Sequence, residues 1–229
     1  MEKTLILNWK HHWVDQWSLY IPLLQNNPFL FIAPPAPLLG LFAQFVPNQV
    51  LSSHLTPHSL GSVTGACGPQ YLQKLAVNTA LLGHSEQREY IAPQMLLSQI
   101  HYSLEHGMKV ILCVGEANPL HYQKELFEQL QFLLNYPCPH LSIAYEPKWA
   151  IGTGQACSMD HLDKVLHFLR QLIPLYNQEK RYYGGSVDQN NVQSFLKRDD
   201  LDGLLLGSMS LKIDLITKLA KEMTADLQL

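Results

Sequence analysis

A glutamate in the second half of the chain has the surroundings expected of a catalytic base. Glu146 ends a short apolar run and is followed by Pro147 and by a segment that contains Gly152 and Gly154. A carboxylate at the end of a buried strand can act as a general base, and a glycine-containing segment after it can close over the site. The pattern favours a base beside a mobile lid, and the competing interpretation is a surface charge beside an ordinary turn.

Other polar residues also follow apolar runs, and they are candidates for the same site. They are Asn8, Lys10, His84, Glu86 and Glu116. In a barrel of parallel strands the C-terminal strand ends share one face, which carries the chemistry. We therefore expect these side chains to lie near Glu146, although an asparagine and a lysine near an N-terminus are most often simply solvated.

The elements that must position these residues are short apolar runs that alternate with longer segments of helical pattern. The runs predict strands at 4–9, 29–33, 50–53, 79–83, 109–114, 141–146, 181–184 and 203–207. Parallel strands need crossover connections, and eight strand–helix units in 229 residues favour a barrel over an open sheet. The sequence thus predicts one α/β domain over residues 1–229, a (β/α)₈ barrel of parallel strands surrounded by helices.

Helix signals are clear in some connections and weak in others. Segment 93–107 has proline and glycine at its ends, and segment 158–172 has an apolar stripe that Ser158 can cap. Segment 38–45 predicts a short helix. Segment 54–73 is rich in glycine, proline and threonine and therefore predicts a long loop rather than a helix.

Charge and composition exclude several classes of partner. The net charge is −3 with histidine neutral, so no basic field is present to bind a nucleic acid or an anionic membrane. The first apolar run is too short for a signal peptide or a membrane span, so we expect a cytoplasmic protein. Hydrophobic residues make up 47% of the chain, which is normal for a well-buried enzyme.

Cysteine and histidine spacings do not indicate a metal site. The cysteines are widely spaced, without a CxxC pair, and we expect free thiols at Cys67, Cys113, Cys138 and Cys157. His54 and His58 have the i, i+4 spacing of a helical metal site, but Pro57 between them disfavours the helix. No metal is therefore expected.

The lid segment also carries a specific resemblance. Residues 144–154, AYEPKWAIGTG, closely resemble the active-site signature of triosephosphate isomerases. Further motifs of that family follow in order over nearly the whole chain: Asn8-Trp9-Lys10, Ala33-Pro34-Pro35, Gly83-His84-Ser85-Glu86, Cys113-Val114-Gly115-Glu116, Tyr183-Gly184-Gly185-Ser186-Val187 and Asp202-Gly203 to Gly207. The resemblance implies a TIM barrel that interconverts dihydroxyacetone phosphate and D-glyceraldehyde 3-phosphate without metal or organic cofactor.

The resemblance also implies roles for the candidate residues. Glu146 would remove a proton from the carbon next to the carbonyl, and His84 would be the electrophile that shuttles a proton between the two substrate oxygens. This family is a standard example of a glutamate base, a neutral histidine and a closing loop. Lys10 would place a positive charge over the developing enediolate, and Asn8 would orient groups at the same end of the site.

Backbone N–H groups rather than basic side chains would bind the substrate phosphate. By the resemblance, these belong to Gly152, Ser186, Gly207 and Ser208. Supporting positions would be Glu86, which positions Lys10 or His84, then Cys113, an inert core thiol, Glu116, and the lid residues Pro147, Trp149, Ile151 and Thr153. The sequence departs from the family pattern at Lys148, Gln155 and Ser208, which bears on lid kinetics and on the phosphate pocket.

The resemblance further implies a homodimer in which loop 59–67 projects into the partner near residues 10–12. The family usually has glutamate at Ala66 and arginine at Gln87, and these two family residues pair. Because both are absent here, we expect a coupled change near the subunit interface.

Two other functions are less consistent with these residues. A catalytically silent or altered-specificity sugar-phosphate barrel that serves as a binding module would be expected to lose Glu146, His84 or Lys10, and all three are present. A Schiff-base aldolase needs a lysine that points into the site from a mid-barrel strand, whereas Lys109 opens its strand at the wrong end.

Overall fold

Eight parallel strands form the centre of the computed structural model, which describes residues 3–134, 139–173 and 179–226. The strands are β1 (Thr4–Asn8), β2 (Leu30–Ala33), β3 (Leu51–Ser52), β4 (Thr79–Leu82), β5 (Lys109–Val114), β6 (Leu141–Tyr145), β7 (Arg181–Tyr183) and β8 (Gly203–Leu206). Every predicted strand is confirmed, and no strand end differs from its prediction by more than one residue.

The strands close almost completely into a barrel. Hydrogen-bonded neighbours follow the order β2-β1-β8-β7-β6-β5-β4-β3. The two outer strands approach each other through a parallel bridge between Ile32 and Val50 and through the Ile32 N–H, which donates to the Gln49 carbonyl at 2.8 Å. The predicted (β/α)₈ barrel is confirmed.

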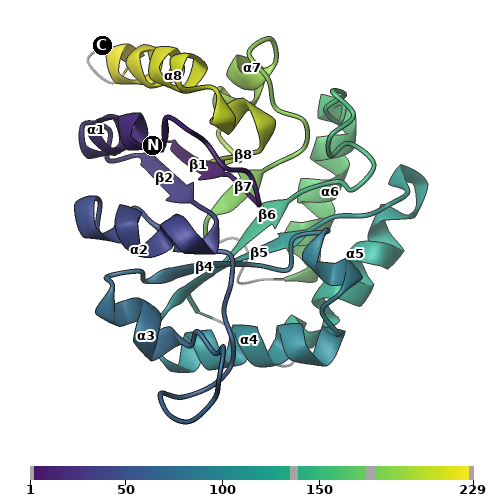
Figure 1. Ribbon diagram of the computed structural model, residues 1–229. Helices are drawn as coiled ribbons and strands as arrows, with labels where there is room; N and C mark the ends of the chain where they lie inside the picture. Colours follow the sequence, from purple (N-terminus) through teal and green to yellow (C-terminus); the bar gives the residue numbers. More distant parts are fainter. Residues whose placement is uncertain (1–2, 135–138, 174–178, 227–229) are drawn as a thin grey trace.

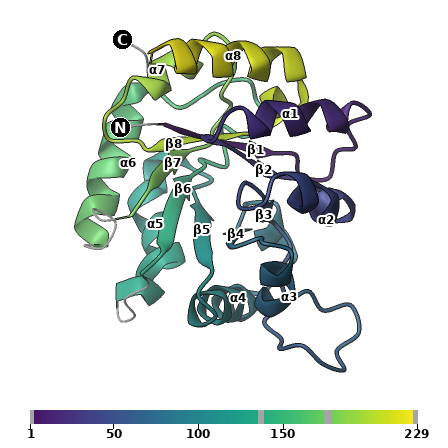
Figure 2. The ribbon, with the colours of Figure 1, turned by 90° about the vertical axis from the view of Figure 1, so that its left-hand side faces the viewer.

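Helices surround the strands on all sides (Figure 1, and Figure 2 after a 90° turn). They are α1 (Tyr20–Gln25), α2 (Ala36–Phe45), α3 (Pro69–Lys74), α4 (Pro93–Glu105), α5 (Tyr122–Leu130), α6 (Met159–Leu172), α7 (Val192–Leu196) and α8 (Ile213–Asp226), with short 3₁₀ turns at Trp17–Leu19, Gln87–Glu89, Pro119–His121, Gln131–Leu134 and Ser208–Leu211. Within the described ranges, none of the helices combines the length and the apolar character needed to cross a membrane.

Local signals set several of these helix ends. Helix α4 begins at Pro93, as predicted, since a proline in the first turn has no N–H that needs a partner. At the start of α6 the Ser158 hydroxyl accepts the His161 N–H at 3.2 Å, which confirms the predicted cap. The prediction of a loop throughout 54–73 is wrong at its end. There Pro69 opens α3, and Leu72 is fully buried, so packing stabilises a helix that the composition disfavours.

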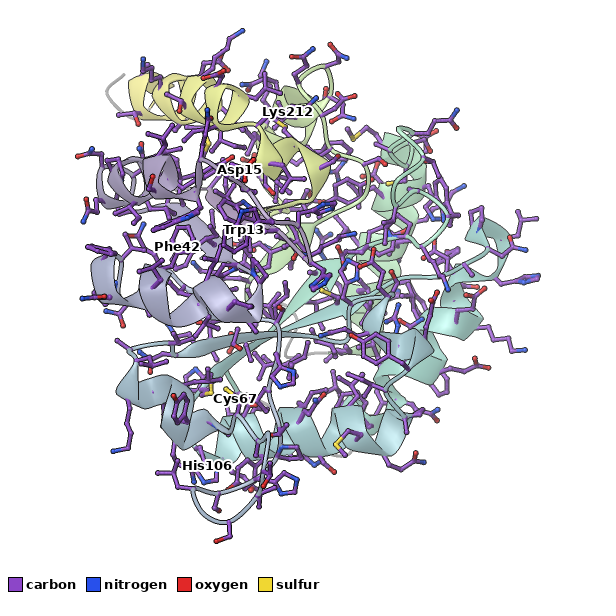
Figure 3. All side chains as sticks on the ribbon, viewed as in Figure 1. Trp13, Asp15, Phe42, Cys67, His106 and Lys212 are labelled. Carbon is purple, nitrogen blue, oxygen red and sulfur yellow. The ribbon has the colours of Figure 1, made fainter. Side chains whose placement is uncertain are left out.

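Two buried clusters form the core. The larger one lies between strands and helices and includes Phe42 of α2, labelled in Figure 3, which packs edge-on against Trp9 with ring centroids 5.4 Å apart. The smaller cluster takes residues from all eight strands and from no helix, so it fills the barrel interior: Ile6, Ala33, Leu51, Leu81, Ile111, Cys113, Ala144, Tyr182 and Leu205.

The alternation of side chains along a strand also decides which residues point inward at the C-terminal end of the barrel. Successive side chains of a strand point to opposite faces, so a residue two positions after an interior residue also points inward. Asn8 follows Ile6 in this way, and Glu146 follows Ala144. The fold therefore directs both predicted site residues toward the barrel axis.

The cysteines that the structure describes have free thiols, as predicted. They are Cys67, Cys113 and Cys157. The fourth, Cys138, lies outside the described residues.

Candidate active site

Glu146 and His84 lie next to each other at the C-terminal ends of β6 and β4. The Glu146 Oε1 and His84 Nε2 atoms are 3.5 Å apart, and the two residues are only 4% and 6% exposed. His84 Nε2 and Glu146 Oε2 are buried and have no hydrogen-bond partner within the described part of the chain. Leaving a buried polar atom unpaired is costly. These two atoms are therefore available to a polar ligand.

The other ring nitrogen of His84 fixes its tautomer. The Glu86 N–H donates to His84 Nδ1 at 3.3 Å. Because Nδ1 accepts this bond, the proton of the neutral ring lies on Nε2. The histidine thus presents an N–H donor on the side that faces Glu146.

Lys10 is held beside this pair. Its Nζ donates to Glu86 Oε1 at 2.8 Å, and its N–H donates to Asn8 Oδ1 at 3.2 Å. Burial opposes ionisation of Glu86, but the hydrogen bond and charge of Lys10, with the charges of His84 and His12, hold the pKa of Glu86 below its ordinary value. Glu86 therefore stays ionised and contacts both residues that it was predicted to position.

Lys10 also has an unusual backbone conformation. Its φ angle is +52°, in the left-handed region that residues other than glycine seldom adopt. Ser186, at the predicted phosphate site, has a φ of +48°. Such conformations cost of order 1–3 kcal/mol and are often retained at functional sites.

A cavity of about 420 Å³ opens between Glu146 and the predicted phosphate-binding turns. It is lined by the four predicted phosphate-binding residues, Gly152, Ser186, Gly207 and Ser208, together with Asn8, Lys10, Glu146 and the lid residue Ile151. His84 lines an adjacent cavity of about 540 Å³, which shares Asn8 and Lys10 with the first. The structure thus brings the predicted catalytic and phosphate-binding residues together.

The walls of the first cavity carry little positive charge. Of the described residues that line it, Lys10 is the only lysine or arginine. Apart from His12 and the neutral polar side chains, the donors that this cavity offers to an anion are therefore backbone N–H groups and the Lys10 ammonium. His12, Gly184 and Asp188 also line it and were not predicted as site residues. The strand period could have identified Gly184, because it follows the interior residue Tyr182 by two positions.

Gly184 makes room for the Glu146 side chain. A Cβ atom at this position would lie 2.9 Å from Glu146 Cγ, closer than real Cβ atoms come, and 3.0 Å from its Oε1, which is also tight. The fully buried Cys113 contacts the Glu146 side chain. Burial and then the nearby Glu146 charge raise the pKa of the Cys113 thiol well above its ordinary value. The thiol is therefore protonated at neutral pH, as an inert core thiol would be.

Residues 147–157, called the lid from here on, are attached at both ends. At the first end, Trp149 Nε1 donates to Glu116 Oε1 at 2.8 Å. At the second, the Cys157 N–H donates to the Tyr183 hydroxyl at 3.0 Å. Between these points the Ser186 hydroxyl donates to the Ala150 carbonyl at 2.5 Å. The lid therefore spans the cavity from the end of β6 to the start of α6.

The remaining predicted lid residues lie along this span. Pro147 follows Glu146 directly and is buried, and the Thr153 hydroxyl donates to the Ala150 carbonyl at 2.9 Å within the lid. Lys148 pairs with Glu89 at 2.9 Å on the surface, and both side chains are about half exposed or more. Such an exposed pair contributes little to stability. Over residues 3–134, 139–173 and 179–226, no group of three or more metal-binding side chains is arranged to hold an ion.

Comparison with known proteins agrees with this geometry. A family model described as Triosephosphate isomerase matches residues 4–223. The triosephosphate isomerase of Prochlorococcus marinus (strain MIT 9301) is 30% identical over 239 residues, which cover 96% of this chain and 99% of the relative. That of Mycoplasma pneumoniae is 32% identical over 93% of this chain and 95% of the relative. That of Mycoplasmopsis agalactiae is 33% identical over 87% and 80%, respectively.

Proposed function

Because the chain belongs to the triosephosphate isomerase family, we propose that it interconverts dihydroxyacetone phosphate and D-glyceraldehyde 3-phosphate in the cavity beside Glu146. The chain is an enzyme, an intramolecular aldose–ketose isomerase. The alternative of a silent or altered-specificity barrel is not favoured, since the polar groups that the reaction requires lie around two adjacent cavities that share Asn8 and Lys10.

In this proposal Glu146 is the base. Its carboxylate takes a proton from the carbon next to the substrate carbonyl, and the electron pair of that C–H bond moves toward the carbonyl to form an enediolate. The resulting carboxylic acid returns the proton to the neighbouring carbon. The unpaired, buried Glu146 Oε2 supports this role, because an oxygen without an internal partner is free to accept the proton.

His84 and Lys10 stabilise the charge that develops on the substrate oxygens. The His84 Nε2–H donates to these oxygens and transfers a proton between them. The ammonium of Lys10, held by Glu86 at 2.8 Å, supplies fixed positive charge. This role is supported by the bond from Glu86 N–H to His84 Nδ1, which directs the ring N–H into the site.

The phosphate is bound at the other end of the cavity. Its oxygens accept backbone N–H groups at Gly152, Ser186, Gly207 and Ser208. With the phosphate bound there, the reacting carbons of the substrate lie at the end of the cavity near Asn8, Lys10, Glu146 and His84.

The observation that carries the proposal is the 3.5 Å approach of two buried groups that each have an unpaired polar atom. Glu146→Gln tests it, because the amide keeps the shape of the side chain but cannot accept a proton. We expect kcat to fall about 10³-fold or more, measured by coupled assay of both triose phosphates. The matched control is Glu128→Gln, an exposed residue of α5 that should keep the parent rate. Activity of the Glu146→Gln variant within tenfold of the parent would show that the base is another residue.

We also propose a homodimer. Loop 59–67 exposes Leu60 (55%) and Val63 (44%) and stands away from the barrel in Figures 1 and 2. The 540 Å³ cavity beside Lys10 has exposed apolar residues, Tyr90 (75%) and Met95 (44%), on its wall. A loop with apolar side chains and an apolar cavity on the same chain are complementary in a two-fold dimer.

The free thiols support a cytoplasmic location, where thiols stay reduced.

A further inference from the structure

A second buried carboxylate lies behind the lid. Glu116 follows β5 and is 0% exposed. Its Oε1 accepts from Trp149 Nε1 at 2.8 Å and from the Tyr145 hydroxyl at 2.9 Å, and His161 Nε2 lies 3.0 Å away. Its Oε2 has no partner in the described residues. All the polar contacts that the structure describes for the Glu116 carboxylate are therefore made through Oε1, and these contacts set its orientation.

The three donors come from three different places around the site. Tyr145 is the last residue of β6 and directly precedes Glu146. Trp149 is in the lid, and His161 is in the first turn of α6, which begins just after the lid ends. Glu116 is consequently the point at which the base, the first part of the lid and the helix after the lid are joined.

His161 contributes a donor here. Both oxygens of a carboxylate only accept, so a bare nitrogen lone pair 3.0 Å from Glu116 Oε1 would be repelled. His161 Nε2 therefore carries a hydrogen. The ring is packed edge-on to Trp149 and to Tyr122, with centroids 5.6 Å apart in each case, and its side chain is 14% exposed.

Among the described residues, His161 is the only basic side chain within ion-pair distance of Glu116. A buried carboxylate is costly unless its oxygens accept hydrogen bonds. Without His161, the carboxylate would keep only the donors of Tyr145 and Trp149 and would be freer to rotate, and Trp149 would lose an aromatic neighbour.

We propose that His161 is a positioning residue for the isomerisation: it fixes the Glu116 carboxylate so that this group holds the Trp149 indole and sets the position of the lid over the substrate. The proposal rests on the function proposed above. It predicts a defect in enclosing the reaction intermediate rather than a loss of the base or of the phosphate site.

When the lid does not fully enclose the enediolate, this intermediate can undergo a side reaction, and the extent of that reaction measures how well the lid is closed. Its electron pair can expel the phosphate group with cleavage of the carbon–oxygen bond, and the enol that remains tautomerises to methylglyoxal. The ratio of inorganic phosphate released to isomerisation turnovers therefore measures how well the lid shields the intermediate. Misfolding that only reduces the amount of active enzyme leaves this ratio unchanged.

Three variants separate the donor from packing. His161→Gln keeps an N–H at the distance of Nε2, His161→Asn has the same amide one methylene shorter, and His161→Leu keeps bulk without a donor. We expect kcat/KM to fall about tenfold in the Leu and Asn variants, with a raised phosphate ratio, and to return to within about threefold of the parent in the Gln variant. His167→Leu, an exposed site on the same helix, is the matched control and should behave like the parent.

A binding measurement reports the position of the lid without requiring catalytic turnover. Trp149 is the only tryptophan of the lid, so the fluorescence change induced by phosphoglycolohydroxamate, corrected with Trp149→Phe, reports its environment. We expect a smaller change in the Leu and Asn variants than in the parent and Gln variant. Equal phosphate ratios and equal fluorescence changes in all variants would overturn the proposal, as would equal defects in Gln and Leu. An inactive parent would overturn the proposed function, while the fluorescence comparison would still decide the role of His161.

Discussion

Glu146 is restricted by neighbours that act in different ways. His84 Nε2 lies 3.5 Å from its carboxylate, the fully buried Cys113 contacts it, and Gly184 leaves the space beside its Cγ. The contacts with His84 and Cys113 are polar, whereas the absence of a Cβ at Gly184 leaves the space that the side chain occupies. At the scale of single residues, the position of the carboxylate therefore depends on packing as well as on charge.

Gly184→Ala should displace the base. The added Cβ would lie 2.9 Å from Glu146 Cγ, so the carboxylate must move by several tenths of an ångström. We expect kcat to fall by about 10²-fold, since a small misplacement of a reacting group can cost that much. Steady-state kinetics of both triose phosphates would measure the effect.

Gly40→Ala is the matched control. Gly40 is within α2, and a Cβ there would meet no atom within 4 Å. Alanine in a helix interior should raise the free energy of unfolding by about 0.5–1 kcal/mol and leave kcat unchanged. A Gly184 variant with the parent kcat would show that Glu146 tolerates the displacement.

At the scale of elements, the site is assembled where β6, the lid and α6 follow one another. The lid passes over the cavity and ends at Cys157, and the cap of α6 is the next residue, Ser158. The same helix carries His161, which reaches Glu116. The start of α6 consequently fixes both the end of the lid and the group that holds its beginning.

Ser158→Ala should destabilise this helix start. The Ser158 hydroxyl accepts the His161 N–H at 3.2 Å, and loss of such a cap costs about 1 kcal/mol. We expect a drop of that size in the free energy of unfolding, measured by urea denaturation. Ser158→Asp keeps the acceptor and adds a favourable charge at the positive helix end, so it should restore the parent stability. Equal stabilities for the Ala and Asp variants would show that the cap does not contribute.

At the scale of the whole molecule, two positions bear on the proposed dimer. They are Gln87 and Ala66, where the family resemblance implies an arginine paired with a glutamate. The Gln87 side-chain amide donates to the Ser53 carbonyl at 2.6 Å within its own chain. Ala66 is half-buried, near the end of loop 59–67 and next to Cys67, which is labelled in Figure 3. Neither residue leaves an unpaired charge.

Introducing one charge at a time should therefore destabilise the dimer. Ala66→Glu or Gln87→Arg alone places an unpaired charge at the interface, which commonly costs about 3–5 kcal/mol when the site is buried, whereas the double variant restores a pair. We expect a lower thermal midpoint and weaker association for each single variant and partial recovery in the double variant, measured by calorimetry and sedimentation.

The outcome that contradicts this account is also specific. Strictly additive effects of the two substitutions would show that the positions do not interact. A parent that sediments as a fully active monomer would show that the loop and the cavity beside Lys10 do not form an interface.

The sequence by itself determined the eight strands and the capped helix at Ser158, and it supplied the candidate site residues that the fold brings together. Buried parallel strands are continuous apolar runs, and caps and strand-end motifs are local signals, so each can be recognised without a structure. The helix at Pro69–Lys74 was missed because burial of Leu72, rather than local composition, stabilises it.

The tertiary structure alone decided the distances on which the chemistry depends. Glu116 and His161 are 45 residues apart in sequence but 3.0 Å apart in space, and Gly184 approaches Glu146 across neighbouring strands. Such contacts depend on strand register, on the closure of the barrel and on where α6 packs. These are set by the packing of the whole core, and no local pattern of residues contains them.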